Sequence, residues 1–142
     1  MSVPAPLRKK SSLEAQIKTD DMVMHTLTIF SNPKVFNPRF QKVADIVIGL
    51  CLDISQNIWN ANLVKVRKHP KRWEKRHDLQ SLALDQFDRL LTLARICRRL
   101  YHLKSGKYEA WIDKICIAQD TTKSWVKSDM KRYGYLSGKS GC

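Results

Sequence analysis

The stretch LQSLALDQFDRLLTLARICRRLY, residues 79–101, decides the fold class of this chain. Core-type side chains, with one glutamine among them, recur in it at steps of four or three residues: Leu79, Ala83, Gln86, Leu90, Ala94, Cys97 and Tyr101. This spacing brings them to one face of an α-helix of about 25 residues. Phe87, Leu93 and Leu100 flank that face and widen it. We therefore predict a long amphipathic helix that packs against other helices.

Three other segments repeat the helical spacing, and no strand-like alternation persists anywhere. Ser11 with Glu14 forms a capping box that predicts the start of the first helix near residue 11. Asn37 followed by Pro38 predicts the start of the second helix. The predicted core faces are Leu13, Ile17, Met24, Leu27 and Phe30 in the first helix, Phe40, Val43, Val47, Leu50, Ile54 and Ile58 in the second, and Tyr108, Ile112, Ile115, Gln119, Thr122, Val126 and Asp129 in the fourth.

Four such helices joined by short connections predict an all-α, up-down-up-down four-helix bundle over residues 11–133. Residues 1–10 are predicted to form a flexible basic arm, and residues 134–142 a flexible Gly/Ser tail. Trp59, Trp111 and Trp125 are interpreted as core residues. Because the apolar faces are wide, either the core is bulky or a second apolar face meets another subunit.

The composition argues against a membrane protein and against a disulfide-stabilised one. No apolar run approaches the roughly 20 residues that a membrane helix needs, and no apolar stretch follows the N-terminal cations as it would in a signal peptide. The four cysteines show no Cys-x-x-Cys spacing, so Cys51, Cys97 and Cys116 are interpreted as small core residues in a reducing compartment. We expect a cytoplasmic protein without membrane contact.

No arrangement of residues predicts catalysis, a cofactor or a metal. The five glycines form no phosphate-binding loop. His69 and His77 are surrounded by Lys and Arg and have no cysteine nearby, which disfavours metal binding. Asp85 and Arg89 are spaced as a surface ion pair on a helix, and no Ser-His or Cys-His constellation is visible. We predict a non-catalytic protein.

The charge is the strongest functional signal. The formal net charge is +13, and the excess is concentrated at residues 8–10, 65–78, 95–107 and 127–139. Residues 65–78, KVRKHPKRWEKRHD, hold seven Lys or Arg against two acids. Such a distribution predicts a polyanionic partner, most plausibly nucleic acid.

Two of these segments supply the candidate contact residues. Because the residue before a proline disfavours helix, His69-Pro70 predicts that 65–78 is a loop at one end of the bundle. Trp73 either stacks on a base or covers the bundle end. Arg95, Arg98 and Arg99 are predicted to form a positive strip that runs between the two ends. The candidate nucleic-acid-binding residues are Lys65, Arg67, Lys68, Lys71, Arg72, Trp73, Lys75, Arg76, Arg95, Arg98, Arg99, Lys104 and Lys107, and they suit backbone contacts that read little sequence.

The region 36–130 resembles the accessory variability determinant family of diversity-generating retroelements. The shared features are Ala61-Asn62 at the end of the second helix, the run Leu90-Leu91-x-Leu93-Ala94-Arg95, the turn Leu103-x-Ser105-x-Lys107-Tyr108, and Trp125 followed by Lys127. Two features depart from the family pattern. Lys123-Ser124 stands where a Gly-Gly pair often precedes the late tryptophan, and the basic loop is long.

This resemblance implies a non-catalytic, basic, barrel-shaped homo-pentamer in a bacterial, archaeal or phage-encoded setting. It implies binding to a reverse transcriptase, to template RNA and to the cDNA made in mutagenic retrohoming. One alternative is a general RNA-binding bundle without a polymerase partner, like the proteins encoded within ribosomal RNA intervening sequences. Another is a protein-interaction adaptor whose cations meet an acidic surface.

Overall fold

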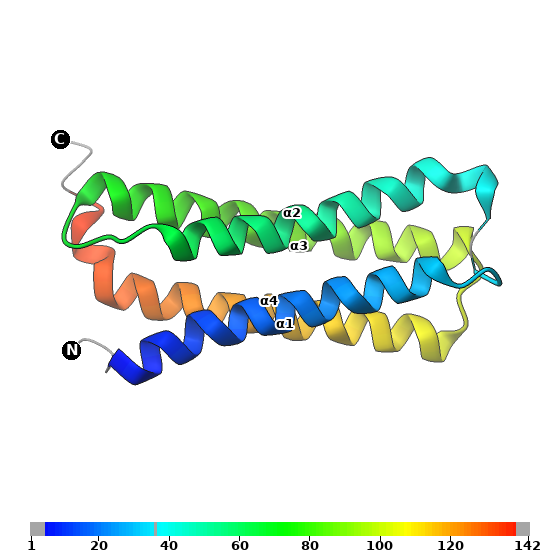
Figure 1. Cartoon of the computed structure of the whole chain (residues 1–142), viewed down its shortest axis with the longest axis horizontal. Helices are drawn as coiled ribbons and strands as arrows, with labels where there is room; N and C mark the ends of the chain where they lie inside the picture. The colour runs from blue at the N-terminus through cyan, green and yellow to red at the C-terminus, as the bar shows by residue number, and fades with distance from the viewer. Residues whose placement is uncertain (1–4, 36, 139–142) are drawn as a thin grey trace.

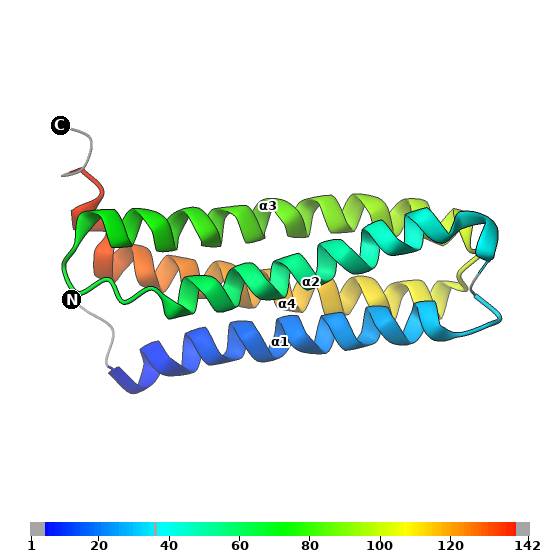
Figure 2. The same cartoon turned by 45° about the horizontal axis from the view of Figure 1, so that its top comes forward.

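The computed structural model describes residues 5–35 and 37–138, with side chains from residue 11 onward. Within these ranges the chain forms four α-helices and no strand: α1 (Ala5–Ser31), α2 (Gln41–Leu63), α3 (Pro70–Leu100) and α4 (Ser105–Tyr133). Figures 1 and 2 show the helices side by side, each running opposite to the one before it. The predicted four-helix bundle is confirmed. None of the described helices is long and apolar enough to span a bilayer.

Each helix packs against two neighbours. α1 lies against α2 and α4, and α3 lies against the same two helices, so the four surround one core. The predicted faces of α2 and α3 are buried there, with Ile54, Ile58 and Leu90 fully enclosed. Asn37 caps the turn Pro38–Phe40 that leads into α2, because its side-chain oxygen accepts a hydrogen bond from the Arg39 amide at 3.0 Å. The predicted helix start at Asn37-Pro38 is therefore confirmed.

The first helix begins earlier than predicted. It starts at Ala5, so Ser11 lies inside α1 and does not cap it. Residues 5–10 are helical and belong to no flexible arm, while the rest of that predicted arm lies outside the described residues. Proline is tolerated in a first helical turn, and Leu7 to Lys10 are good helix formers, so the segment extends the helix once the rest of α1 is packed.

The structure confirms the predicted face of α1 only at its C-terminal end. Phe30 is buried and Leu27 packs against the core, whereas Leu13, Ile17 and Met24 are 60%, 46% and 62% exposed. The buried side of the helix carries Thr26, whose hydroxyl donates a hydrogen bond to the Met22 carbonyl at 2.9 Å and is thereby satisfied inside the core. The prediction for Leu13, Ile17 and Met24 was wrong because apolar residues lie on both sides of α1.

Two of the three tryptophans predicted to lie in the core are buried, and the third is exposed. Trp111 and Trp125 lie at the centre of the buried face of α4, whereas Trp59 is 53% exposed on α2. Trp111 is held by a hydrogen bond from its Nε1 to the Thr26 hydroxyl at 2.9 Å. Edge-to-face contacts of Phe30 with Tyr101 and with Trp111 fill the core around it. The core interpretation is thus confirmed for Trp111 and Trp125 and wrong for Trp59.

The third helix is longer than predicted and absorbs most of the segment interpreted as a loop. His69 is extended, as the proline rule requires, but Pro70 occupies the first position of α3, where its fixed backbone angle suits a helix. Residues 70–78 are therefore helical, and only residues 64–69 connect α2 to α3. The basic side chains from Lys71 onward project from a rigid helix.

The C-terminal segment is also more ordered than predicted. Residues 134–136 form a 3-10 turn, and Leu136 is buried in a small second cluster with Val66 and Trp73. The prediction of a flexible tail starting at residue 134 was wrong because this one leucine anchors the chain. The end of that predicted tail, residues 139–142, lies outside the described residues.

We expect Leu90→Asp to abolish cooperative folding or to lower the free energy of unfolding by about 4 kcal/mol or more, because a carboxylate there has no partner in the core. Leu82→Asp is the matched control, since Leu82 lies on the same helix and is 47% exposed whereas Leu90 is fully buried. Urea unfolding followed by circular dichroism measures both variants. A normal transition for Leu90→Asp would contradict the assignment of the core.

Candidate nucleic-acid interface

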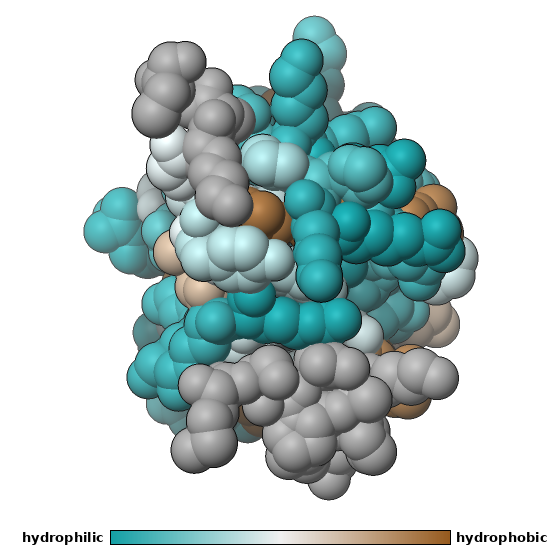
Figure 3. Space-filling view, turned by 90° about the vertical axis from the view of Figure 1, so that its left-hand side faces the viewer, coloured by the Kyte–Doolittle hydropathy of each residue, from teal (hydrophilic) through white to brown (hydrophobic). Residues whose placement is uncertain are grey.

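The antiparallel connectivity gathers three of the four basic segments at one end of the bundle. Figure 1 shows the start of α1, the 64–69 connection and the end of α4 at the same end, so residues 8–10, 65–78 and 127–138 converge there. We call this the basic end. Its exposed cations are Lys65, Arg67, Lys68, Lys71, Arg72, Lys75, Lys127 and Lys131, and Arg132 is half-buried among them. Figure 3 looks onto this end and shows a mostly hydrophilic surface.

The end of α4 adds cations to this end of the bundle. Arg132 lies about sixty residues from the 64–69 connection along the chain but lines the same hollow as residues 64–68. The sequence could have predicted this meeting, because an up-down-up-down bundle brings the connection between its second and third helices to the same end as both chain ends. The charge patches and the topology had to be combined to see it.

The predicted positive strip along α3 does not join the two ends. Arg95, Arg98 and Arg99 are exposed but lie near the opposite end, with Lys104 and Lys107. Arg98 donates to the Ser105 hydroxyl at 3.2 Å and lies over the Tyr108 ring at 4.7 Å. The middle of α3 is acidic, because it contains three acids, Asp78, Asp85 and Asp88, and one cation, Arg89. The helix has 31 residues, about 46 Å, so the two basic ends are separate surfaces.

The connection at the basic end has a strained backbone. Arg67 and Lys68 have φ angles of 46° and 66°, in the left-handed region that favours glycine. Each such residue costs on the order of 1 kcal/mol. The conformation is held by the buried Val66 side chain and by a 2.9 Å hydrogen bond from the His69 amide to the Val66 carbonyl. Strain of this kind is often found at functional sites, and here it projects two cations outward.

The first turn of α3 opposes the usual charge preference of a helix. The partial positive charge at a helix N-terminus is stabilised by acids, yet this turn contains Lys71 and Arg72 and no acid. The N-cap residue, His69, makes no side-chain capping bond. The cationic side chains and the partial positive charge of the helix N-terminus thus lie together, an arrangement that favours a bound anion such as phosphate.

One predicted contact residue, Arg76, belongs to the core and not to the surface. Its Nε donates to Asp129 Oδ2 at 2.7 Å, and the Arg76 side chain is only 11% exposed. Its Nη1 donates to the carbonyls of Ala61 and Val64 at 3.4 and 3.2 Å, and its guanidinium lies 5.3 Å from the centre of the Trp125 ring. Arg76 therefore ties α3 to α4 and to the end of α2, and its role as a free cation was predicted wrongly.

Trp73 packs into the bundle end, so the second of its two predicted roles is confirmed. It is 1% exposed, and its Nε1 donates to the Ser137 hydroxyl at 2.8 Å. The His77 and Tyr133 rings lie 4.9 and 5.5 Å from it, centre to centre. No face of Trp73 is available to a base, so the stacking prediction is wrong.

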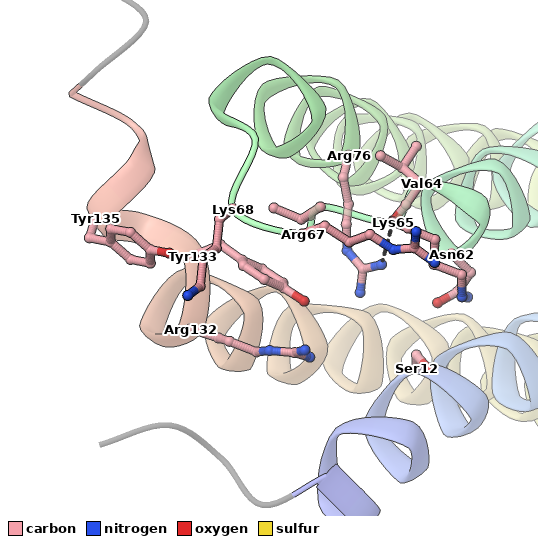
Figure 4. Close-up of a pocket in the computed structure, with 11 residues that line it drawn as sticks. Ser12, Asn62, Val64, Lys65, Arg67, Lys68, Arg76, Arg132, Tyr133 and Tyr135 are labelled. Carbon is pink, nitrogen blue, oxygen red and sulfur yellow. Dashed lines mark hydrogen bonds between the residues drawn. The ribbon is translucent and has the colours of Figure 1, made fainter.

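Two hollows flank the 64–69 connection. The first, which we call the tyrosine pocket, has a volume of about 590 Å³ and lies between this connection, α1 and α4; Figure 4 shows its lining, which includes Lys65, Arg67, Lys68, Arg76, Arg132 and Tyr133. The second, which we call the leucine groove, has about 610 Å³ and lies between α2 and α3, lined by Leu63, Leu79, Lys65, Arg67, Arg72 and Lys75. Lys65 and Arg67 contribute to both.

The titration behaviour offers no sign of catalytic chemistry in these hollows. Burial raises the pKa of the Cys51 and Cys97 thiols to about 11, so both stay protonated and unreactive at neutral pH. Burial likewise lowers the pKa of His25 and raises that of Tyr101. None of these four groups lines either hollow. Over residues 5–35 and 37–138, no three His, Cys, Asp or Glu side chains are grouped as metal ligands would be.

Comparison with known proteins leaves the family open, since no family model, curated protein or solved structure matches this chain. The fold and site define a class: a four-helix bundle with separate basic surfaces at its two ends. The likeness to accessory variability determinant proteins remains a resemblance of sequence. The interpretation of the site rests on its own geometry.

We expect Arg76→Ala to lower the free energy of unfolding by about 3–5 kcal/mol, because it leaves the buried Asp129 carboxylate without its partner. Lys75→Ala, one position earlier and exposed, should change it by no more than about 0.5 kcal/mol. The double variant Arg76→Met with Asp129→Leu should recover most of the loss, since both charges are removed together. Urea titration distinguishes these outcomes, and equal losses for the two alanine variants would contradict the structural role of Arg76.

Proposed function

We propose that this chain is a non-catalytic nucleic-acid-binding bundle that grips the phosphate backbone with its basic end. The observation that carries the proposal is the convergence there of exposed cations from the 64–69 connection, the start of α3 and the end of α4. In the described part of the molecule one ion pair is present, between Arg76 and Asp129. None of the other described cations of the basic end makes an ion pair, although Glu74 and Asp78 lie beside Lys71 and Lys75. These cations can therefore pair with phosphates.

The shape of the surface supports a strand of nucleic acid over an acidic protein patch. The cations line two hollows that meet at Lys65 and Arg67, which suits a chain of regularly spaced charges laid across the connection. Arg67 and Arg72 offer bidentate contacts to phosphate, and the lysines supply mobile charge. Contacts of this kind position a backbone and carry little sequence information.

We further propose that this protein serves a reverse transcriptase as an accessory, holding template RNA and cDNA, as the sequence resemblance implies. The exposed apolar face of α1 and α2 is consistent with a protein partner or with the homo-pentamer that the resemblance implies. Gln16 and Asp20 on α1 hydrogen bond to Ser55 on α2, at 3.1 and 2.7 Å, and define the seam between the helices. Large apolar side chains border this seam on both helices: Leu13, Ile17, Met24, Leu52 and Trp59.

RNA binding tests the first part of the proposal. If the chain contacts six or more phosphates, its affinity should fall on the order of a thousandfold between about 50 and 200 mM salt. Reversing Lys71, Arg72 and Lys75 to Glu should weaken binding and reduce the slope of log affinity against log salt by about three. Arg76 is left unchanged in this variant because its loss would unfold the protein.

The same reversal at Arg99, Lys104 and Lys107 measures the share of the opposite end, and circular dichroism checks that both variants stay helical. Affinity and slope unchanged by the first reversal would refute the role of the basic end. A wild-type protein that binds no RNA would favour the adaptor with an acidic partner.

Assembly is tested by mass photometry of wild-type protein and of Leu52→Asp with Trp59→Asp. We expect the variant to be monomeric and to keep its helical circular dichroism spectrum, because both side chains are half-exposed in one chain. Leu63→Asp, on the same helix and 59% exposed but nearer the basic end, is the control. Co-purification of a co-expressed reverse transcriptase with wild-type protein separates the accessory role from the general RNA-binding bundle, which would bind RNA but no polymerase.

A further inference from the structure

The tyrosine pocket differs from the rest of the basic end in being concave and enclosed by three elements. Ser12 of α1 lies on one side, Asn62 and the 64–68 backbone on another, and Arg132 with Tyr133 of α4 on the third. Its volume of about 590 Å³ falls within the range of small-molecule sites, roughly 300–1,000 Å³. A nucleotide fits such a space, whereas a duplex is far too wide to enter it.

The floor of this pocket is made of hydrogen-bond donors. Figure 4 shows the guanidinium groups of Arg76 and Arg132 and the hydroxyl of Tyr133 pointing toward the same space. Arg76 is fixed there, because its Nε and Nη1 are committed to Asp129 and to the carbonyls of Ala61 and Val64, while its Nη2 makes none of these bonds. Arg132 is steadied by its position 4.6 Å over the Tyr133 ring. The two guanidinium groups are thus preorganised for an anion with several oxygens.

Arg76 and Arg132 line the pocket, and neither side chain is fully exposed. The exposed cations Lys71, Arg72 and Lys75 do not line the pocket and can serve the phosphates of a duplex or of an internal stretch of strand from outside. A group that projects into the pocket would contact Arg76 and Arg132 together. The end of a strand can project in this way, because a terminal phosphate has no nucleotide beyond it.

Charge favours the same ligand. A terminal phosphate monoester carries about 1.5 to 2 negative charges at neutral pH, and an internal diester carries one. Arg132, Lys65, Arg67 and Lys68 supply positive charge around the pocket, and no acid lines it. The charge of Arg76 is balanced by Asp129, so Arg76 contributes a hydrogen-bond donor, its Nη2. Tyr135, 58% exposed at the mouth, presents an aromatic ring beside which the first base can lie.

We propose that the tyrosine pocket binds the terminal phosphate of a single-stranded nucleic acid, with Arg76 and Arg132 as the principal ligands and the Tyr133 hydroxyl as a third donor. This inference rests on the proposed nucleic-acid-binding function and adds the recognition of a strand end. The basic surface outside would hold the backbone, and the pocket would set the register of the strand from its end.

The test uses the full chain and three single-stranded RNAs of one sequence, with a 5′-phosphate, a 3′-phosphate or hydroxyls at both ends. Each carries its fluorescent label within the strand, and binding is followed by anisotropy. We expect a strand with a terminal phosphate to bind roughly tenfold more tightly than the hydroxyl strand, as charge-assisted hydrogen bonds at this site would give. The end that shows the preference is the one that the pocket holds.

Arg132→Gln should remove this preference, and it should lower the affinity for the hydroxyl strand by no more than Lys131→Gln does. Lys131→Gln is the matched control, because Lys131 is adjacent, exposed and outside the pocket, so it should weaken all three strands alike. Tyr133→Phe, which keeps the ring against Trp73, should reduce the preference in part. Thermal melts confirm that each variant is folded, and Arg76 is not substituted.

Equal affinity of wild-type protein for all three RNAs, with strong salt dependence intact, would overturn the terminal-phosphate site and leave the proposed function standing. A preference that survives in Arg132→Gln would overturn the assignment of the pocket. If no RNA binds at any salt concentration, the proposed function itself fails.

Discussion

The buried contact between Arg76 and Asp129 determines the geometry of the end where function is proposed. It joins α3 to α4, and Nη1 of Arg76 donates to the carbonyls of Ala61 and Val64 at the end of α2, so one guanidinium contacts three helices. Asp129 also accepts from Gln80 Nε2 at 2.7 Å, which satisfies the carboxylate further. Taking both charges out of water is costly, and the geometry must be good for the pair to form at all. That requirement makes the end of the bundle rigid in a way that apolar packing alone would not.

Rigidity at this end matters because the surrounding features oppose stability. The 64–69 connection holds two residues in left-handed conformations, and α3 starts with like charges beside its own positive dipole. Without the anchoring of Val66, Trp73 and Leu136 in their small cluster, this segment would relax and spread its cations. The buried contacts of this cluster thus hold the segment in the conformation that keeps its positive charges close together.

The sequence predicted the architecture well where periodicity was strong and unambiguous. The faces of α2 and α3 were assigned correctly because one side of each helix is apolar in nearly every turn. The prediction for the first part of α1 failed because Leu13 and Met24 match the helical period as well as its inner residues do. For the candidate site, charge clustering in the sequence predicted a concentration of cations at the 64–69 end of the bundle, and the structure places exposed cations there. Charge clustering could not separate Arg76 from Lys75, since pairing with Asp129 depends on a contact 53 residues away. Arg132 and Tyr133 were missed for the same reason.

The left-handed pair at the connection has a thermodynamic consequence. Glycine would occupy these two positions without strain, yet the chain places Arg67 and Lys68 there. Without a bound anion, the folded protein therefore has both backbone strain and repulsion between like charges at this connection. A polyanion that binds only the folded form relieves the electrostatic share and stabilises that form by mass action. The melting temperature of the bundle should then rise with the concentration of such a polyanion and fall again when salt displaces the polyanion.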